Sequence, residues 1–203
     1  MAKRIVLAGV LGAIAMFIWS FVAHMVLPLG YAGIREIPNE TAVLGAMHAS
    51  LGQTSGMYLF PALGAGPNPT TAQRNAAMKD YAPKLAANPS GLLIYHPPGA
   101  TGITGGKLGL EFLAEFVETL LAVILLAQAR IAGYAGKVGF IALVGVVASV
   151  ASSIPYWNWY GFPGSYTGAY MSTQIIAFLV AGLAAAAVLK NREPLGFVAA
   201  AKA

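Results

Sequence analysis

Four long apolar segments occur along the chain: residues 5–27, 108–129, 138–154 and 170–189. A helix rises about 1.5 Å per residue, so about 20 residues cross a hydrocarbon core of about 30 Å. Each segment is long enough, or nearly so, for one crossing. The pattern therefore predicts four transmembrane helices.

The second segment contains Glu111, Glu115 and Glu118, so its depth in the membrane has to be argued. If the membrane began only after Glu118, residues 119–129 would cover about 16 Å, half of a bilayer core. Extending the helix past Arg130 would leave no room for a turn before the next apolar segment. We therefore expect the three carboxylates to lie inside the span, in its first half.

The first segment follows Lys3 and Arg4, an arrangement that a cleavable secretory signal also has. Its apolar run is longer than the signal's usual core of about 7 to 15 residues. In addition, Phe21 would occupy the position three before a cut after Ala23, where a small residue is preferred. We therefore expect an uncleaved first helix.

The composition is typical of a membrane protein. Hydrophobic residues make up 58% of the 203 residues and charged residues 9%, where a soluble domain has about 25% charged residues. The mean hydropathy is +0.69. The chain has no cysteine, which excludes disulfides, thiolate metal sites and thiol catalysis. Its net charge of +5 comes from scattered residues without a basic stripe, so we expect no nucleic-acid partner.

The charges also predict the orientation of the four spans. One side of the membrane would carry a single acid, Glu193, against these basic residues: Lys3, Arg4, Arg130, Lys137, Lys190, Arg192 and Lys202. The positive-inside rule places that side, with both termini, in the cytoplasm. For a bacterial inner membrane, the chain then divides into transmembrane helix 1 (1–27), a periplasmic α+β subdomain (28–107), and transmembrane helices 2 to 4 with a cytoplasmic tail (108–203).

The long segment between the first two spans predicts secondary structure of its own. Residues 40–51 have helical periodicity after a plausible N-cap at Asn39. Thr71 is expected to cap a second helix that runs through about Tyr81 and ends before Pro83. Two short β-prone runs, bounded by Gly and Pro, are expected to pair into a small sheet: residues 57–60 and 92–95.

The most specific signal is the spacing of Glu111, Glu115 and Glu118, at positions i, i+4 and i+7. At about 100° per residue they fall within about 60° of one helix face. A charged side chain near the bilayer centre costs at least about 2.5 kcal/mol, so this face should meet protein, water or a bound ion. By depth along the helices, His24 is expected level with Glu111, and Ser20, one turn further in, is expected nearer Glu115.

Other polar side chains fall in the same outward half of the spans. Together they predict an outward polar pocket that includes Ser20, Ser149, Ser152, Thr173 and Gln174. Small residues occupy the inward half of the first and last spans: Ala8, Gly9, Gly12, Ala13, Ala181, Gly182, Ala185 and Ala186. Because small residues let helices approach closely, we expect a tight seam there.

Three interpretations of the Glu face stay open. It is structural if its carboxylates only hydrogen-bond to serines and histidine of neighbouring helices. It relays protons if burial and like-charge crowding keep some carboxyl groups protonated. It binds a divalent metal ion as a cofactor if histidines join the carboxylates as ligands. The candidate metal ligands are Glu111, Glu115, Glu118, His24 and His48, with His96 as a further option.

An aromatic stretch separates the last two apolar segments: Tyr156, Trp157, Asn158, Trp159 and Tyr160. Amphipathic rings gather at the level of the lipid headgroups, so we expect this stretch to be an interfacial anchor. The alternative is a lid or a docking surface for a quinone, lipid or pigment, with Asn158 as its polar group.

Four short stretches carry a resemblance to a known group: residues 19–20, 24–30, 37–40 and, above all, 154–163, which reads IPYWNWYGFP. They resemble an uncharacterised group of small bacterial inner-membrane proteins with four predicted spans. The similarity covers most of the chain and implies no activity for any residue.

No catalytic residues are predicted, since the chain has no Ser-His-Asp arrangement, phosphate-binding loop or zinc-protease motif. We therefore expect a non-catalytic membrane protein, an accessory subunit of a complex or a self-associating one, whose partners are the lipid bilayer and other membrane subunits. The alternative is a metal-binding or proton- or cation-handling membrane protein that uses the Glu face. A lipid-active enzyme at the outer leaflet is the third hypothesis.

Overall fold

The structure is a computed structural model, and it describes residues 2–129 and 131–189. The chain forms two compact units. Met1–Ile34 and Ile103–Ala203 make up the first, which we call the helical unit, and Arg35–Gly102 makes up the second, the inserted unit. Several charges used for the predicted orientation lie outside the described residues: Arg130, Lys190, Arg192, Glu193 and Lys202. The predicted cytoplasmic tail lies outside them as well.

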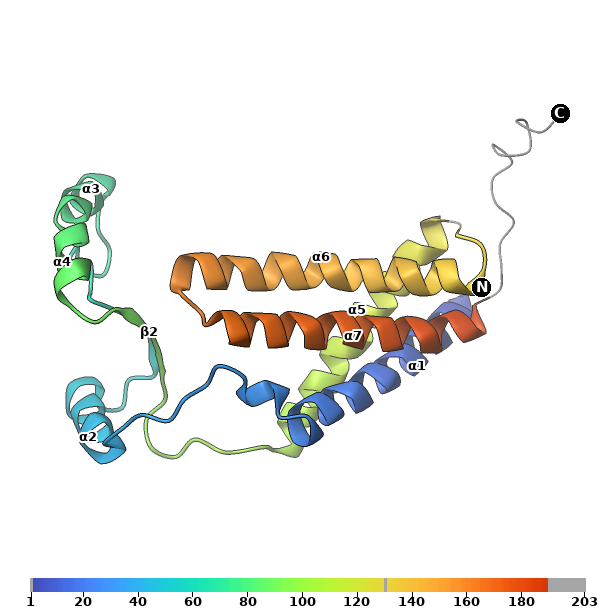
Figure 1. Cartoon of the computed structure of the whole chain (residues 1–203), viewed down its shortest axis with the longest axis horizontal. Coiled ribbons are helices and arrows are strands. Elements are labelled where there is room, and N and C mark those ends of the chain that lie inside the picture. The colour runs from blue at the N-terminus through green and yellow to red at the C-terminus, as the bar shows by residue number, and fades with distance from the viewer. Residues whose placement is uncertain (1, 130, 190–203) are drawn as a thin grey trace. The chain divides into compact units, whose positions relative to one another are not determined.

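Four long helices build the helical unit (Figure 1). They are α1 (Ala2–Phe21), α5 (Gly105–Ala129), α6 (Tyr134–Tyr160) and α7 (Gly164–Val188). A π-helical turn, η1 (Val22–Val26), continues α1, and a short 3₁₀ turn, η2 (Leu29–Tyr31), follows it. α1 packs against both α5 and α7, and α7 packs against α6. α1 is therefore the helix that brings α5 into the unit.

Within the described residues, three helices are long and apolar enough to cross a membrane: Ala2–Val26, Tyr134–Tyr160 and Gly164–Val188. The prediction of four spans is therefore wrong, because α5 is not among them. The physical argument against a span is the charge between residues 107 and 118 of α5, Lys107 and the three glutamates, which a hydrocarbon core solvates poorly. The length argument placed the three glutamates inside the span, although a charged side chain near the bilayer centre costs at least about 2.5 kcal/mol. Both termini were expected on the same side of the membrane because four crossings are an even number. Without the fourth span, this argument for a cytoplasmic C-terminus no longer holds.

Two predicted helix boundaries are also wrong. α6 does not stop at residue 154 but continues through Pro155 to Tyr160. Proline removes one backbone N–H and its ring crowds the carbonyl four residues earlier, so a helix continues past it only where other contacts offset that cost. The helix ends instead at Gly161, whose φ of 68° is a left-handed conformation that glycine adopts without strain. α7 then begins at Gly164, earlier than predicted, so the aromatic stretch is the last turn of α6 rather than a connection.

The predicted seam of small residues is buried in the helical unit. All eight of the predicted small residues are buried: Ala8, Gly9, Gly12, Ala13, Ala181, Gly182, Ala185 and Ala186. The larger core side chains around them include Met16, Val123, Ile141 and Phe178. Small residues therefore set how closely α1 approaches α5 and α7.

The inserted unit contains two antiparallel strands and three helices. Its elements are α2 (Glu40–Leu51), β1 (Gly56–Phe60), α3 (Thr71–Lys79), α4 (Tyr81–Ala87) and β2 (Gly91–Tyr95). The two strands pair with Met57 opposite Ile94, as the β-prone runs predict. The buried Tyr95 donates its hydroxyl proton to the Gly52 carbonyl at 2.9 Å, which ties β2 to the end of α2.

The helices of the inserted unit follow the predictions in part. α2 has the predicted bounds, with Asn39 at its N-cap. The predicted cap is one residue off: Thr71 is the first residue of α3, and the N-cap is Thr70, which forms a capping box with Gln73. Pro83 does not terminate this region, because it falls in the first turn of α4, where a missing N–H leaves no helical hydrogen bond unmade.

Candidate functional site

The site is centred on Glu115, on the face of α5 that packs against α1. The buried residues of α5 are Glu115, Thr119, Ala122, Val123 and Leu126. Their spacing of three and four residues places them on one side of the helix. Glu115 is 5% exposed, which is unusual for a carboxylate because burial removes its hydration.

One hydrogen bond links this carboxyl group to α1. The Ser20 hydroxyl donates to Oε1 of Glu115 at 2.6 Å. The depth argument from the sequence predicts this pair. The other oxygen, Oε2, is buried, and no described group forms a hydrogen bond with it. Half of the carboxyl group is therefore satisfied and half is not.

The three glutamates do not converge. Glu111 and Glu118 are exposed, whereas Glu115 is buried. Burial raises the pKa of Glu115 to about 7 from its ordinary 4.5, opposed by the hydrogen bond from Ser20 and assisted by the charges of Glu111 and Glu118. The Glu face is thus one buried acid beside two exposed ones.

His24 lies in η1, one turn beyond Ser20. Its Nδ1 is 2.9 Å from the Ser20 carbonyl oxygen, and its side chain is exposed. Gly30 packs closely against the ring, because a Cβ at this position would lie 2.7 Å from His24 Cδ2. His24 is therefore held close to Ser20, and its hydrogen-bond partner is a backbone carbonyl rather than a carboxylate.

Most of the predicted pocket residues bond within their own helices. Ser149, Ser152 and Thr173 donate to backbone carbonyls three or four residues earlier. Gln174 lies 3.4 Å from the Tyr170 hydroxyl on the same helix. Of the five predicted residues, Ser20 is the one that the structure joins to a glutamate. The predicted pocket as a whole stays a prediction.

Two residues near Glu115 escaped the sequence argument. Thr119 is fully buried and donates to the Met16 sulfur at 3.7 Å, across the contact between α5 and α1. Trp19 donates from Nε1 to the Thr173 carbonyl at 2.9 Å, which joins α1 to α7. The spacing i+4 from Glu115 could have identified Thr119, whereas nothing in the sequence singles out the pair of Trp19 and Thr173.

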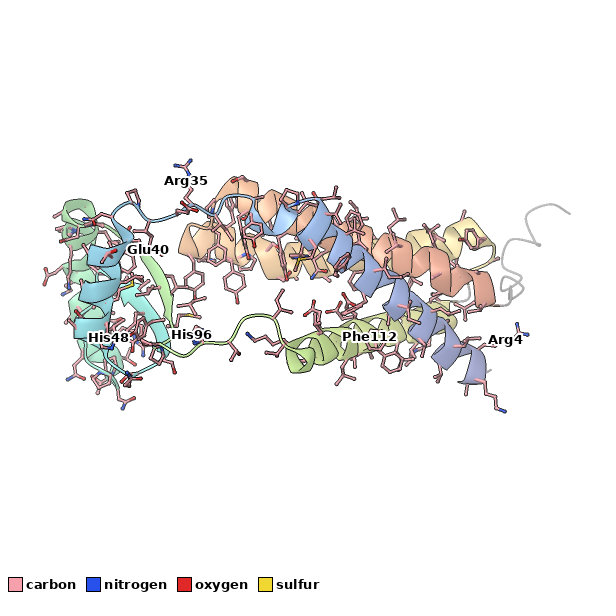
Figure 2. All side chains as sticks on the ribbon, turned by 90° about the horizontal axis from the view of Figure 1, so that it is seen from below. Arg4, Arg35, Glu40, His48, His96 and Phe112 are labelled. Atoms are coloured by element: carbon pink, nitrogen blue, oxygen red, sulfur yellow. The ribbon has the colours of Figure 1, made fainter. Side chains whose placement is uncertain are left out.

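The divalent-metal hypothesis gains no support from the described geometry. Among residues 2–129 and 131–189, no three His, Cys, Asp or Glu side chains group as metal ligands would. His48 and His96 belong to the inserted unit (Figure 2), whereas the glutamates belong to the helical unit. The proposed ligand set stays a prediction.

Lys137, predicted to lie in a connection between spans, belongs to the first turns of α6 and is 3% exposed. Its ammonium group donates to the Leu189 carbonyl at 2.7 Å. That carbonyl is at the C-terminal end of α7, where a positive charge is favourable. Lys137 therefore joins the start of α6 to the end of α7.

The aromatic stretch extends farther than the sequence indicated. Ring centroids are 5.8 Å apart between Tyr156 and Tyr160 and 5.3 Å apart between Tyr156 and Phe162. The row continues onto α7 through Tyr166 and Tyr170, with separations of 5.6 and 6.2 Å. The two tryptophans of the stretch are exposed, so an interfacial anchor stays a fitting prediction.

Comparison with known proteins gives no assignment: no family model matches the chain, and no significant match is found among curated proteins or solved structures.

Proposed function

We propose that the protein is a non-catalytic membrane subunit that works by associating with another membrane protein or with further copies of itself. The observation that supports this proposal is the outer surface of α5. This helix packs on α1 through Glu115 and the buried residues that follow it, while Glu111 and Glu118 remain exposed.

The outer surface of α5 mixes carboxylates with large apolar side chains. The exposed apolar residues include Leu110, Leu113, Val117, Leu121 and Leu125. α5 lies against α1, a helix apolar enough to cross a membrane. Acyl chains solvate carboxylates poorly, and water solvates the leucines poorly. A protein surface offers both polar and apolar contacts, so a partner is the best match for this face.

The assembly state of the full chain in a mild detergent tests the proposal. We expect a mass above one copy, or a second membrane protein that stays bound, in sedimentation and native mass measurements. Replacing Glu111 and Glu118 together with glutamine should raise the dissociation constant about tenfold, because it removes two charged contacts at the interface.

The matched control replaces Glu36 and Glu40, two exposed acids of the inserted unit, with glutamine. This pair should leave the assembly unchanged. A monomer without a partner in several mild detergents would contradict the proposal, and equal effects of the two double variants would show that the α5 surface is not the interface.

We also propose that the protein resides in a bacterial inner membrane with the inserted unit in the periplasm. The support is local to the first helix. Lys3 and Arg4 precede α1, and the positive-inside rule keeps that end in the cytoplasm. Because α1 is long and apolar enough to cross, the segment after it would emerge on the opposite side.

Thiol labelling tests this orientation, because the native chain has no cysteine that would react. Ser55→Cys, at an exposed position of the inserted unit, should react with a membrane-impermeant maleimide added to intact cells whose outer membrane is permeabilised. Ala2→Cys, at the start of α1, should react only after lysis. The reverse labelling pattern would refute the orientation.

A further inference from the structure

The contact between α5 and α1 holds a buried acid whose bonding is incomplete. Glu115 is 5% exposed, and its Oε1 accepts the Ser20 hydroxyl proton at 2.6 Å. Its Oε2 is enclosed, with no hydrogen-bond partner in the described part of the chain. A buried oxygen that carries negative charge without a donor is costly, whereas a protonated carboxyl group carries no charge.

None of the groups that shift the pKa of Glu115 is basic: apart from burial, they are Ser20, Glu111 and Glu118. On α5 and the elements that pack against it, the described acidic and basic residues are Lys3, Arg4, His24, Lys107, Glu111, Glu118 and Lys137. Lys3 and Arg4 lie about 24 Å or more from Ser20 along the axis of α1. Lys137 donates to the Leu189 carbonyl. His24 approaches the Ser20 carbonyl, and α7 has no acidic or basic side chain between Gly164 and Val188.

The two closest charges on the same helix are unfavourable. Glu111 and Glu118 lie one turn before and one turn after Glu115, and both raise its pKa in addition to the effect of burial. A divalent cation would need several more oxygen ligands, and the described residues form no such group. A proton needs one carboxyl oxygen, which Glu115 has.

We propose that Glu115 and Ser20 form a buried proton-binding site between α5 and α1, which holds its proton at a pH where an ordinary solvent-exposed glutamate has lost its own. The proton comes from water and returns to water, and no other bond forms or breaks. The Ser20 hydroxyl shifts this equilibrium, because its hydrogen bond stabilises the ionised carboxylate of Glu115 and so favours release of the proton. This site is independent of the proposed association, which uses the exposed side of α5.

Infrared difference spectra of the purified full chain, titrated from about pH 4 to about pH 9, measure this proton directly. We expect a protonated carboxyl band that persists well above the ordinary glutamate range and disappears near pH 7. Glu115→Gln should remove the band, whereas Glu111→Gln should retain it. A titration that is the same in wild type and Glu115→Gln overturns the proposal.

A second pair of variants keeps the carboxyl group in place. Ser20→Ala removes the donor to the charged form, so the band should titrate about one pH unit higher. Ser152→Ala is the matched control, because its hydroxyl bonds to backbone carbonyls of its own helix, and it should leave the titration unchanged. Equal midpoints in all three proteins would contradict the assigned role of Ser20.

Thermal unfolding gives an independent readout of the same proton. The folded chain binds it with a pKa of about 7, against 4.5 for an ordinary glutamate. Stability from this group is therefore fully present below about pH 4.5 and is lost as the pH rises through about 7. In Glu115→Gln, the thermal stability should no longer decline over this pH range. If Na⁺ at constant pH stabilises wild type but not Glu115→Gln, the site takes a metal cation and the proton assignment is wrong.

Discussion

Replacing Gly145 with alanine should destabilise the folded protein by about 3 kcal/mol, because the new methyl group has no space. A Cβ at this position of α6 would overlap Cβ of Phe178 on α7 and lie 2.7 Å from its Cγ. Phe178 is 4% exposed, and its Cβ moves only with the backbone, so a change of rotamer does not relieve the contact. The midpoint of unfolding in a mild detergent, monitored by circular dichroism, measures the effect.

The same helix offers a control for this substitution. Gly139 has no atom within 4 Å of its ideal Cβ position among the described residues. Gly139→Ala should therefore be neutral or stabilising by up to about 1 kcal/mol, since alanine favours helix more than glycine does. If the two variants behaved alike, the close approach of α6 to α7 at Gly145 would not exist in solution.

Gly12→Ala is expected to have a comparable effect, about 2 to 3 kcal/mol, because it affects two helix contacts at once. A Cβ here would overlap Thr119 Cγ2 on α5 and lie 3.3 Å from the Ala181 carbonyl oxygen on α7. Both helices would have to move away from α1. The midpoint of unfolding in detergent measures the loss of stability. The contact between α1 and α5 also predicts which second substitution restores it.

Thr119→Ser is that second change. It removes Cγ2, the atom in the shortest contact, and keeps the hydroxyl that donates to Met16. The double variant Gly12→Ala with Thr119→Ser should therefore recover most of the lost stability, and the double-mutant cycle should give a coupling of about 1 to 2 kcal/mol. Additive effects of the two substitutions would mean that Gly12 and Thr119 do not touch.

The sequence predicted best where short-range patterns decide the structure. Residues 40–51 form the predicted helix, and the runs at 57–60 and 92–95 pair as strands. It predicted less well where packing overrules a local signal. Pro155 is a strong helix-breaking signal, yet α6 continues past it because α7 lies alongside.

The number of spans is a second case in which a local sequence pattern and the tertiary structure disagree. Apolar length alone placed residues 108–129 among the membrane helices, and α5 is a helix there as expected. It is nevertheless not among the three helices that qualify as candidate spans in the described chain. Neighbouring residues set helix formation, whereas the environment of a helix depends on how its charges are paired, and the sequence does not state the pairing.

The site around Glu115 separates the two sources of information most clearly. The sequence by itself determined that three acids share about 60° of a helix face and that Ser20 lies nearer than His24 to the depth of Glu115. Only the tertiary structure decided which acid is buried.

Relative to Glu115, the buried residues Thr119, Val123 and Leu126 extend to one side of the helix. Glu111 and Glu118 lie about 40° and 60° to the other side. The edge of the contact with α1 therefore runs between the acids. Its position depends on the rotation of α5, which the packing of Gly9 and Gly12 against Leu120 and Thr119 fixes.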